Sequence, residues 1–418
     1  MVLSRVREGI GSISTETALV VGLISGSQFI NHVFMVLLPP ILPILASDLD
    51  VSITMLGLAL GAQALVSAAA QLPFGYLGDR YDRTIALGLS SFVGAVGALL
   101  TAMAATFPEL LLGQIVLGVG VGGHHAAHYP LISDATGESV RGRAFAVYNF
   151  GGTLGFATPP VFITAVIAVQ GLTWRHAIGG LGLLGFMYAI LITSIFYWRV
   201  DSAITTPNVT AAPNGTSLRG RFRSELRLLV SEPGILAISL LALFGSTVSW
   251  GVTTYAVVYL TDVYQVSLQT ANLTLTGLFV VGAGAILAGG DLTDRFGGGR
   301  VLTWSLFGTT VLIALIATRL VPAVLAIGLF LLLGGVRSLI SPARDELTER
   351  LATHGTVSKS FAIVTIGLML GSTIAPPTFG YIIQSRDVPT AFGAIAVVSF
   401  AATLLTLLVL NKFSNTNQ

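Results

Sequence analysis

Twelve apolar runs, most of them about twenty residues or longer, constrain this chain more than any other feature of its sequence. The hydrocarbon core of a bilayer is ~30 Å thick, and a helix crosses it with ~20 apolar residues. The chain is 53% hydrophobic and only 10% charged, whereas a soluble domain carries about 25% charged residues. We therefore predict an all-α membrane protein with transmembrane helices at 18–46, 52–78, 84–105, 109–133, 144–170, 177–198, 235–261, 268–290, 301–319, 321–342, 358–384 and 389–411.

The positive residues are divided unequally between the two sides of the membrane. Of the 21 lysines and arginines, Arg337 lies inside a predicted span, Arg175, Arg319 and Arg386 lie in loops on one side, and the remaining seventeen lie on the other. Cytoplasmic loops of membrane proteins are enriched in Lys and Arg. We therefore expect the N- and C-termini to be cytoplasmic, in a plasma or inner membrane.

The two halves of the chain resemble each other. "GYLGDRYDR" begins at Gly75 and "GDLTDRFGG" at Gly290, and "FAVYNFGGTLGFATPP" begins at Phe145 and "FAIVTIGLMLGSTIAPP" at Phe361. The two pairs have almost the same offset, which indicates duplication, and transporters place a binding site between such repeats. We predict two pseudo-symmetric six-helix bundles, 1–199 and 234–418, joined by a cytoplasmic linker at 200–233.

Composition excludes several other classes of protein. The chain has no cysteine, which excludes disulfides, thiolate catalysis and cysteine-ligated metals. Its net charge of +2 is too small to indicate a nucleic-acid partner. The first apolar run is longer than the ~7–15 residue core of a signal peptide, so we interpret it as a retained helix. We expect no cofactor and a monomer whose partners are the bilayer, a small-molecule substrate and protons.

The duplicated motif after the second and eighth predicted helices resembles the signature of the major facilitator superfamily, Gly-x-Leu-x-Asp-Arg-x-Gly-Arg. The residues that match it are Gly75, Leu77, Asp79, Arg80 and Arg83 in the first copy and Gly290, Leu292, Asp294, Arg295 and Gly297 in the second. The resemblance covers the whole chain and implies a transporter that works by alternating access. We interpret the motif as a cytoplasmic gate, because an aspartate can face the partly positive start of a helix. The alternative is that its arginines only hold the loop inside.

The fourth and fifth predicted helices are similar to those of fosmidomycin-resistance-type exporters, in a histidine near a proline and a GG-x-x-G run. This resemblance implies export. Glycines and prolines in the fifth and eleventh helices interrupt regular backbone bonding. We interpret seven of them as helix-bending residues, with close packing around a static kink as the alternative: Gly151, Gly155, Pro159, Pro160, Gly371, Pro376 and Pro377.

In the resembling family, helices 1, 4, 7 and 10 line a central cavity. Polar residues inside spans are costly unless they contact water, substrate or one another. We therefore predict a substrate and proton cavity lined by Gln28, Asn31, His32, His124, His125, His128, Trp250, Tyr255 and Arg337.

The three histidines of "GGHHAAHYP" fall within about 100° on a helical wheel and so project from one face. No carboxylate lies in the middle of a predicted span, so histidine is the group available to carry a proton near neutral pH. The alternative for each histidine is a hydrogen bond between helices. A metal site is disfavoured, because the zinc-protease pattern needs Glu where His125 stands.

Arg337 lies deep in the tenth predicted helix, and the repeat offset places it at the level of Gly122, within one turn of His124. We interpret it as a cation that binds an anionic substrate; a contact with helix-end carbonyls or with Asp345 is the alternative. The sequence thus predicts a secondary transporter for a small organic anion, exporting it by proton antiport. Proton symport or facilitated uptake is the alternative within transport, and a histidine-metal membrane enzyme is the alternative in another class.

Overall fold

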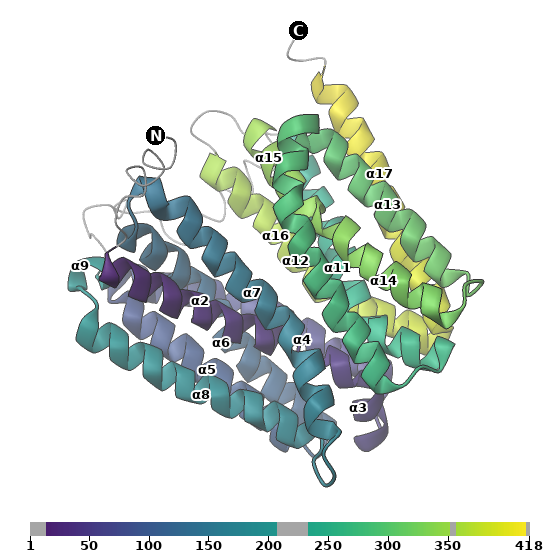
Figure 1. Ribbon diagram of the computed structural model, residues 1–418, viewed down its shortest axis with the longest axis horizontal. Helices are drawn as coiled ribbons and strands as arrows, with labels where there is room; N and C mark the ends of the chain where they lie inside the picture. Colours follow the sequence, from purple (N-terminus) through teal and green to yellow (C-terminus); the bar gives the residue numbers. More distant parts are fainter. Residues whose placement is uncertain (1–13, 207–232, 352–356, 415–418) are drawn as a thin grey trace, which may run out of the picture. The chain divides into compact units, whose positions relative to one another are not determined.

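A computed structural model describes residues 14–206, 233–351 and 357–414. Within these ranges, twelve helical segments are long and apolar enough to cross a membrane, which confirms the predicted all-α class (Figure 1). The helices are α2 (Thr15–Met35), η1 (Pro39–Ile41), α3 (Leu42–Asp48), α4 (Ile53–Arg80), α5 (Arg83–Met103), α6 (Phe107–Ala135), α7 (Glu138–Ile167), α8 (Trp174–Arg199), α9 (Ser202–Thr205), α11 (Pro233–Tyr264), α12 (Leu268–Phe296), α13 (Gly298–Ala317), α14 (Ala323–Ser338), α15 (Ile340–Leu351), α16 (Val357–Ser385) and α17 (Val388–Ser414).

The chain divides into two compact units. The first comprises Met1–Leu37 and Val66–Ala212, and the second comprises Leu38–Leu65 and Pro213–Gln418. The segment Leu38–Leu65 therefore packs with the second unit, although the sequence-based boundaries assign it to the first bundle. Those boundaries, 1–199, 200–233 and 234–418, stay a prediction, and positions 207–232 of the linker lie outside the described residues.

Two of the predicted spans are interrupted rather than continuous. The run 18–46 ends as an α-helix at Met35, and a 3-10 turn over Pro39–Ile41 precedes α3. The run 321–342 ends at Ser338, and α15 begins at Ile340. Proline has no N–H and cannot continue the ladder of helical hydrogen bonds. Pro39 stands where an N–H would bond to Met35, and Pro342 stands where one would bond to Ser338, which accounts for both breaks.

Close helix packing in the first unit depends on small residues. A Cβ placed on Gly120 of α6 would overlap the backbone of Gly94 in α5 and lie 2.8 Å from the Ser90 carbonyl oxygen. Small residues let the backbones of membrane helices approach one another in this way.

Helix α5 starts at a well-formed cap, where the Asp82 side chain accepts hydrogen bonds from the backbone N–H groups of Thr84 at 2.6 Å and Ile85 at 3.2 Å.

The prolines of α7 and α16 do not end those helices, each of which continues past its Pro-Pro pair. Two of the glycines predicted to allow bending pack against a neighbouring backbone. A Cβ on Gly151 would lie 2.6 Å from the Ser25 carbonyl oxygen, and one on Gly371 would lie 2.5 Å from that of Leu243. Gly155 packs in the same way against α2. These contacts agree with the close-packing alternative, and bending stays a prediction.

Candidate functional site

His128 links three helices of the first unit. Its side chain is fully buried on α6, where Nε2 lies 2.9 Å from Ser27 Oγ of α2. Its Nδ1 lies 3.3 Å from the hydroxyl of Tyr148 on α7. Both ring nitrogens therefore have a hydrogen-bonding partner, which offsets the cost of burying a polar ring.

The Tyr148 hydroxyl is shared between two imidazoles. Nδ1 of His125 lies 3.2 Å from the same oxygen that contacts His128, and the tyrosine is only 1% exposed. A phenol has one hydrogen, so it donates to one partner and accepts from another. When both imidazoles are neutral, one of them carries its hydrogen on Nδ1 and the other does not.

His32 has a hydrogen-bond partner at each ring nitrogen. Its Nδ1 lies 2.8 Å from the Gly152 carbonyl oxygen and its Nε2 lies 2.7 Å from Gln28 Nε2. A carbonyl only accepts, so His32 carries a hydrogen on Nδ1. The ring stacks on Phe156 with centroids 4.0 Å apart and lies 6.3 Å from the ring of His125. The structure thus brings His32 and His125 together.

His124 points in another direction, toward α5. Its Nδ1 lies 2.7 Å from Ser90 Oγ and 2.9 Å from the Gly120 carbonyl oxygen, and its Nε2 lies 3.3 Å from Ser91 Oγ. The side chain is fully buried. The helical wheel placed the three histidines on one face, but their spread of about 100° is wide enough for the neighbours of α6 to divide them. In this structure His124 makes the helix–helix contact that was the alternative interpretation.

The histidine cluster does not have the arrangement of a metal site. Among the described residues, no group of three or more His, Asp or Glu side chains is placed to hold a metal ion. The nitrogens of His32, His124 and His128 contact hydroxyl, carbonyl or amide groups instead.

Two amides on α2 hold buried polar atoms without partners. Asn31 is fully buried and Gln28 is 3% exposed. Both side-chain polar atoms of Asn31, and Oε1 of Gln28, find no hydrogen-bond partner among the described residues. A buried polar atom without a partner costs about 1–3 kcal/mol, so these amides are suited to bind a ligand or water that supplies both donors and acceptors.

Arg337 is the central residue of the second unit's candidate site. It lies in the last turn of α14, and its Nη1 donates to the Ser249 carbonyl oxygen at 2.9 Å, to Ser249 Oγ at 2.6 Å and to Thr253 Oγ1 at 3.2 Å. All three partners lie on α11 and are neutral. Asp345, the alternative partner suggested by the sequence, binds Arg344 instead, with 2.8 Å between Nη2 and Oδ1.

Helix α11 presents different residues to different neighbours. Ser249 and Thr253 are one turn apart and share the face toward Arg337. Tyr255 lies about 200° around the helix from Thr253; it is fully buried and donates its hydroxyl hydrogen to the Pro376 carbonyl oxygen at 2.5 Å. Trp250 is partly buried. The structure therefore separates Tyr255 from Arg337, with which the sequence grouped it.

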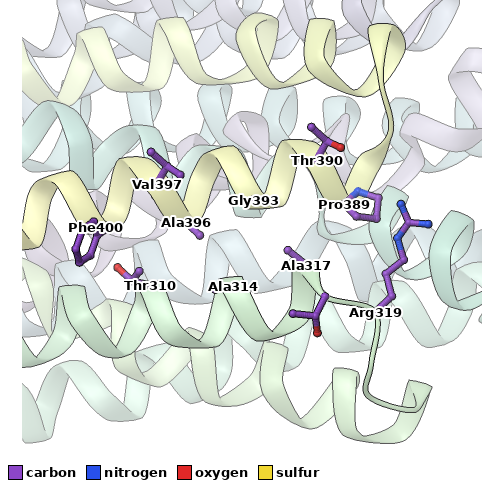
Figure 2. A pocket seen from close by; sticks show the side chains of 11 residues that line it. Thr310, Ala314, Ala317, Arg319, Pro389, Thr390, Gly393, Ala396, Val397 and Phe400 are labelled. Carbon is purple, nitrogen blue, oxygen red and sulfur yellow. The ribbon is translucent and has the colours of Figure 1, made fainter.

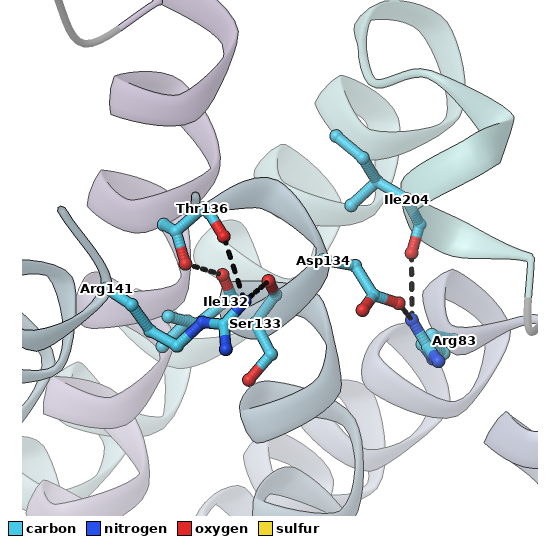
Figure 3. Close-up of polar contacts among 7 residues, drawn as sticks. All are labelled: Arg83, Ile132, Ser133, Asp134, Thr136, Arg141 and Ile204. Atoms are coloured by element: carbon cyan, nitrogen blue, oxygen red, sulfur yellow. Dashed lines mark hydrogen bonds and ion pairs between the residues drawn. The ribbon is translucent and has the colours of Figure 1, made fainter. Parts of the chain in front are cut away.

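The first copy of the duplicated motif contacts the end of α6 through Arg83 (Figure 3). Arg83 pairs with Asp134 and donates to the Ile204 carbonyl oxygen of α9 at 3.1 Å. Asp79 and Arg80 are exposed at the end of α4, where the Arg80 guanidinium lies 5.6 Å from the Tyr76 ring centroid.

A second arginine holds the same helix end. Nη2 of Arg141 on α7 donates to the carbonyl oxygens of Ser133 and Thr136, both at 3.2 Å (Figure 3). The last carbonyls of a helix lack intrahelical partners, and cations near them are favourable. The end of α6 is thus fixed by arginines from α5 and α7.

The second copy of the motif ends α12. Gly290 is partly buried, whereas Asp294 and Arg295 are exposed. The helix stops at Gly297, whose φ of 82° is a left-handed conformation that favours glycine.

The Major Facilitator Superfamily profile matches residues 24–260 and 239–418. The chain belongs to this superfamily. It is 26% identical to the fosmidomycin resistance protein of Escherichia coli K12 over 290 residues, which are 69% of this chain and 68% of that protein. A protein of the same organism named "Probable L-galactonate transporter" is 27% identical over 251 residues, 59% of this chain and 55% of that protein.

The fold matches a solved superfamily structure over almost its full length. A bacterial homologue of the human lysosomal transporter Spinster, in an inward-facing and unoccupied conformation, has a TM-score of 0.80 at 17% identity, with 97% and 99% of the two chains covered. The protein is thus a multi-pass membrane transporter of a solute and not an enzyme.

Four residues of this facilitator that contact the histidines or Arg337 were not predicted from the sequence. Ser27, Tyr148, Ser249 and Thr253 supply hydrogen-bond partners to His128, His125 and Arg337. Ser249 and Thr253 had a usable signal, since hydroxyls one turn apart share a helix face. Tyr148 lies on the fifth span, outside the four helices that the resemblance pointed to.

Proposed function

We propose that this facilitator exports a small organic anion by alternating access, in exchange for protons. Arg337 is the anion-binding residue, and His125, Tyr148 and His128 carry the proton. Gln28, Asn31, His32 and Trp250 line the path of the substrate. His124 holds α6 against α5, and Tyr255 holds α11 against α16.

One observation carries the anion assignment: a guanidinium inside a candidate span has only neutral partners among the described residues. The span is Ala323–Leu351, and the acceptors that Arg337 contacts are a carbonyl and two hydroxyls. A buried charge is costly unless an opposite charge accompanies it. A substrate carboxylate or phosphonate would supply that charge.

The geometry of Arg337 leaves one edge of the guanidinium for such a ligand. Its hydrogen bonds to described residues all leave from Nη1, and Nε finds no partner among the described residues. The Nε–Nη2 edge presents two parallel N–H groups, which match the two oxygens of a carboxylate or phosphonate. Ser249 and Thr253 hold the opposite edge and so fix the orientation.

Arg337→Met tests this assignment, because methionine keeps an unbranched apolar stem and removes the charge. Ligands that bind the folded state raise its apparent thermal stability, so a panel of carboxylates and phosphonates identifies binders of the wild-type protein. We expect Arg337→Met to abolish their stabilising effect, and Arg386→Gln, which changes an exposed cation, to preserve it. If the same ligands stabilise Arg337→Met as much as they stabilise the wild-type protein, Arg337 is not the anion-binding residue.

The proton assignment follows from the shared phenol. A protonated His128 gives the hydrogen on Nδ1 to the Tyr148 oxygen, while the phenol passes its own hydrogen to Nδ1 of His125. One proton moves from one imidazole to the other, and Tyr148 is neutral before and after. Three other titratable groups surround the hydrogen-bonded series His125–Tyr148–His128. Between ring centroids, His32 lies 6.3 Å from His125, His124 lies 5.3 Å from His128 and Tyr129 lies 5.7 Å from Tyr148.

Flux into or out of proteoliposomes under an imposed pH gradient tests proton coupling. Antiport predicts that solute accumulates on the more acidic side, and symport predicts accumulation on the more alkaline side. Facilitated diffusion predicts a rate that does not change when the gradient is collapsed, and that result would remove proton coupling. Export of a drug would confer resistance to it, and one relative is named a fosmidomycin resistance protein; an organic anion agrees with the name of the L-galactonate relative.

The duplicated motif is proposed as the cytoplasmic gate. Its support is the contact of Arg83 with both Asp134 and α9, which ties three helix ends of the first unit together. Asp79→Asn should slow turnover more than it weakens substrate binding. Equal turnover in wild type and variant would leave the motif a topological role only.

We further propose that the N- and C-termini face the cytoplasm of a plasma or inner membrane. Because the chain has no cysteine, single cysteines report topology directly. Ser139→Cys and Gln170→Cys both lie at exposed positions on opposite predicted sides. An impermeant thiol reagent added to intact cells should label Gln170→Cys alone; labelling of Ser139→Cys alone would invert the topology.

A further inference from the structure

The second unit contains a groove that none of the transport residues enters. It lies between α13 and α17, has a volume of about 590 Å³ and is lined mainly by small and apolar side chains (Figure 2). Four small residues form much of its lining: Ala314, Ala317, Gly393 and Ala396. The two helices are held together by the hydrogen bond from Ser399 Oγ to the Leu306 carbonyl oxygen, at 3.0 Å.

One end of the groove is charged. Arg319 follows the last turn of α13, and Asp387 directly precedes α17. Arg319 Nη2 lies 2.6 Å from Asp387 Oδ2, and the side chains remain 52% and 46% exposed. Figure 2 shows the Arg319 side chain at the same end of the groove as Pro389 and Thr390. A guanidinium carries five N–H donors, so pairing with Asp387 leaves others for a second anion.

The length of the groove matches one leaflet of a bilayer. From Thr310 to Ala317 helix α13 rises about 11 Å, and from Pro389 to Phe400 helix α17 rises about 16 Å. Half of the ~30 Å hydrocarbon core is ~15 Å. A lipid acyl chain that starts at the charged end of the groove would therefore reach the middle of the membrane at Phe400.

We propose that this groove is a binding site for one phospholipid whose headgroup carries both a phosphate and a primary ammonium. An acyl chain fills the groove, the phosphate accepts hydrogen bonds from Arg319, and the ammonium donates to Asp387. The charge pair at the groove's end has the same two signs as such a headgroup, which distinguishes this lipid from an anionic one. The proposal does not depend on the identity of the transported solute.

Filling the groove tests the acyl-chain site. A Cβ on Gly393 would meet nothing within 4 Å, so Gly393→Leu should fold normally and occupy the groove. Gly328→Leu on α14 is the matched control, since a Cβ there also meets nothing within 4 Å and lies outside the groove. Both changes replace a helical glycine with the same residue and so raise helix propensity alike.

The measurement is native mass spectrometry of the purified full chain with equal amounts of phosphatidylethanolamine, phosphatidylcholine and phosphatidylglycerol. We expect wild type and Gly328→Leu to retain one phosphatidylethanolamine, and Gly393→Leu to lose it. Arg319→Gln should weaken retention of that lipid by about tenfold, equivalent to ~1.4 kcal/mol. Asp387→Asn, which keeps a good helix cap, should remove the preference for phosphatidylethanolamine over phosphatidylglycerol.

Two results would overturn the proposal. Equal lipid retention in Gly393→Leu and Gly328→Leu would show that lipid does not occupy the groove. A wild-type preference for phosphatidylglycerol would show that the charge pair does not select the headgroup.

Discussion

Replacing Tyr148 with phenylalanine removes one oxygen atom from the centre of the histidine cluster and retains the ring. That oxygen lies 3.2 Å from Nδ1 of His125 and 3.3 Å from Nδ1 of His128, so the change removes two hydrogen bonds between α6 and α7. Bonds between membrane helices contribute ~0.6 kcal/mol on average and up to ~1.7 kcal/mol. We therefore expect Tyr148→Phe to lower the free energy of unfolding by about 1–3 kcal/mol.

Double-mutant cycles separate this loss into its parts. Combining Tyr148→Phe with His125→Ala or with His128→Ala should give a coupling energy of about 0.6–1.7 kcal/mol for each pair. His124→Ala is the control, because that imidazole contacts α5; its change should be additive with Tyr148→Phe to within ~0.5 kcal/mol. Coupling to His125 and His128 no larger than coupling to His124 would refute the shared hydroxyl. In transport, Tyr148→Phe should flatten the pH dependence of flux while substrate binding persists.

Two further predictions concern stability. Gly120→Ala should destabilise the protein by about 1–3 kcal/mol through overpacking against α5, whereas Gly75→Ala, whose Cβ would make an ordinary contact at 3.9 Å, should be neutral or stabilising; thermal unfolding of the two variants checks this. Hydrogen bonds from the Thr390 side chain and backbone N–H, with Arg319 as a smaller cause, lower the pKa of Asp387 below its ordinary value. Because this pKa is lower in the folded state, the ionised carboxylate stabilises the protein above pH ~4, and this stabilisation is lost as the pH falls further. Asp387→Asn should therefore reduce the loss of stability on acidification. An identical acid profile in wild type and variant would contradict this prediction.

The spans could be predicted from the sequence because each apolar run must cross the same thickness of hydrocarbon. Their interruptions could not be read as easily. Pro39 and Pro40 lie in the apolar stretch VLLPPILPIL, and Pro342 is the last residue of the predicted run 321–342; hydropathy does not distinguish a helix from a turn of similar composition. Only the requirement for backbone hydrogen bonding marks these positions as breaks.

The neighbour that each candidate site residue contacts could not be predicted from the sequence. A helical wheel gives the direction of each side chain from its own helix, but the identity of the neighbour in that direction depends on tertiary packing. For this reason His124, with Ser90 and Ser91 beside it, has a different environment from His128, although the two lie one turn apart. For the same reason the contact of Tyr255 with α16 could not be predicted, since its partner is distant in sequence.

The two clusters have different electrostatic roles, and this difference determines how coupling could arise. Arg337 stays protonated near neutral pH, so an anion site at this residue cannot by itself link transport to protons. The imidazoles of His125 and His128 can gain charge, but their partners are hydroxyls rather than substrate. Coupling therefore requires that protonation of the histidine chain changes the relative stability of the transporter's conformations, because a ligand shifts an equilibrium only through its differential affinity for the two states. Solute binding at Arg337 should then vary with pH in wild type and lose that dependence in Tyr148→Phe. A pH-dependent affinity that persists in Tyr148→Phe would place the coupling group elsewhere.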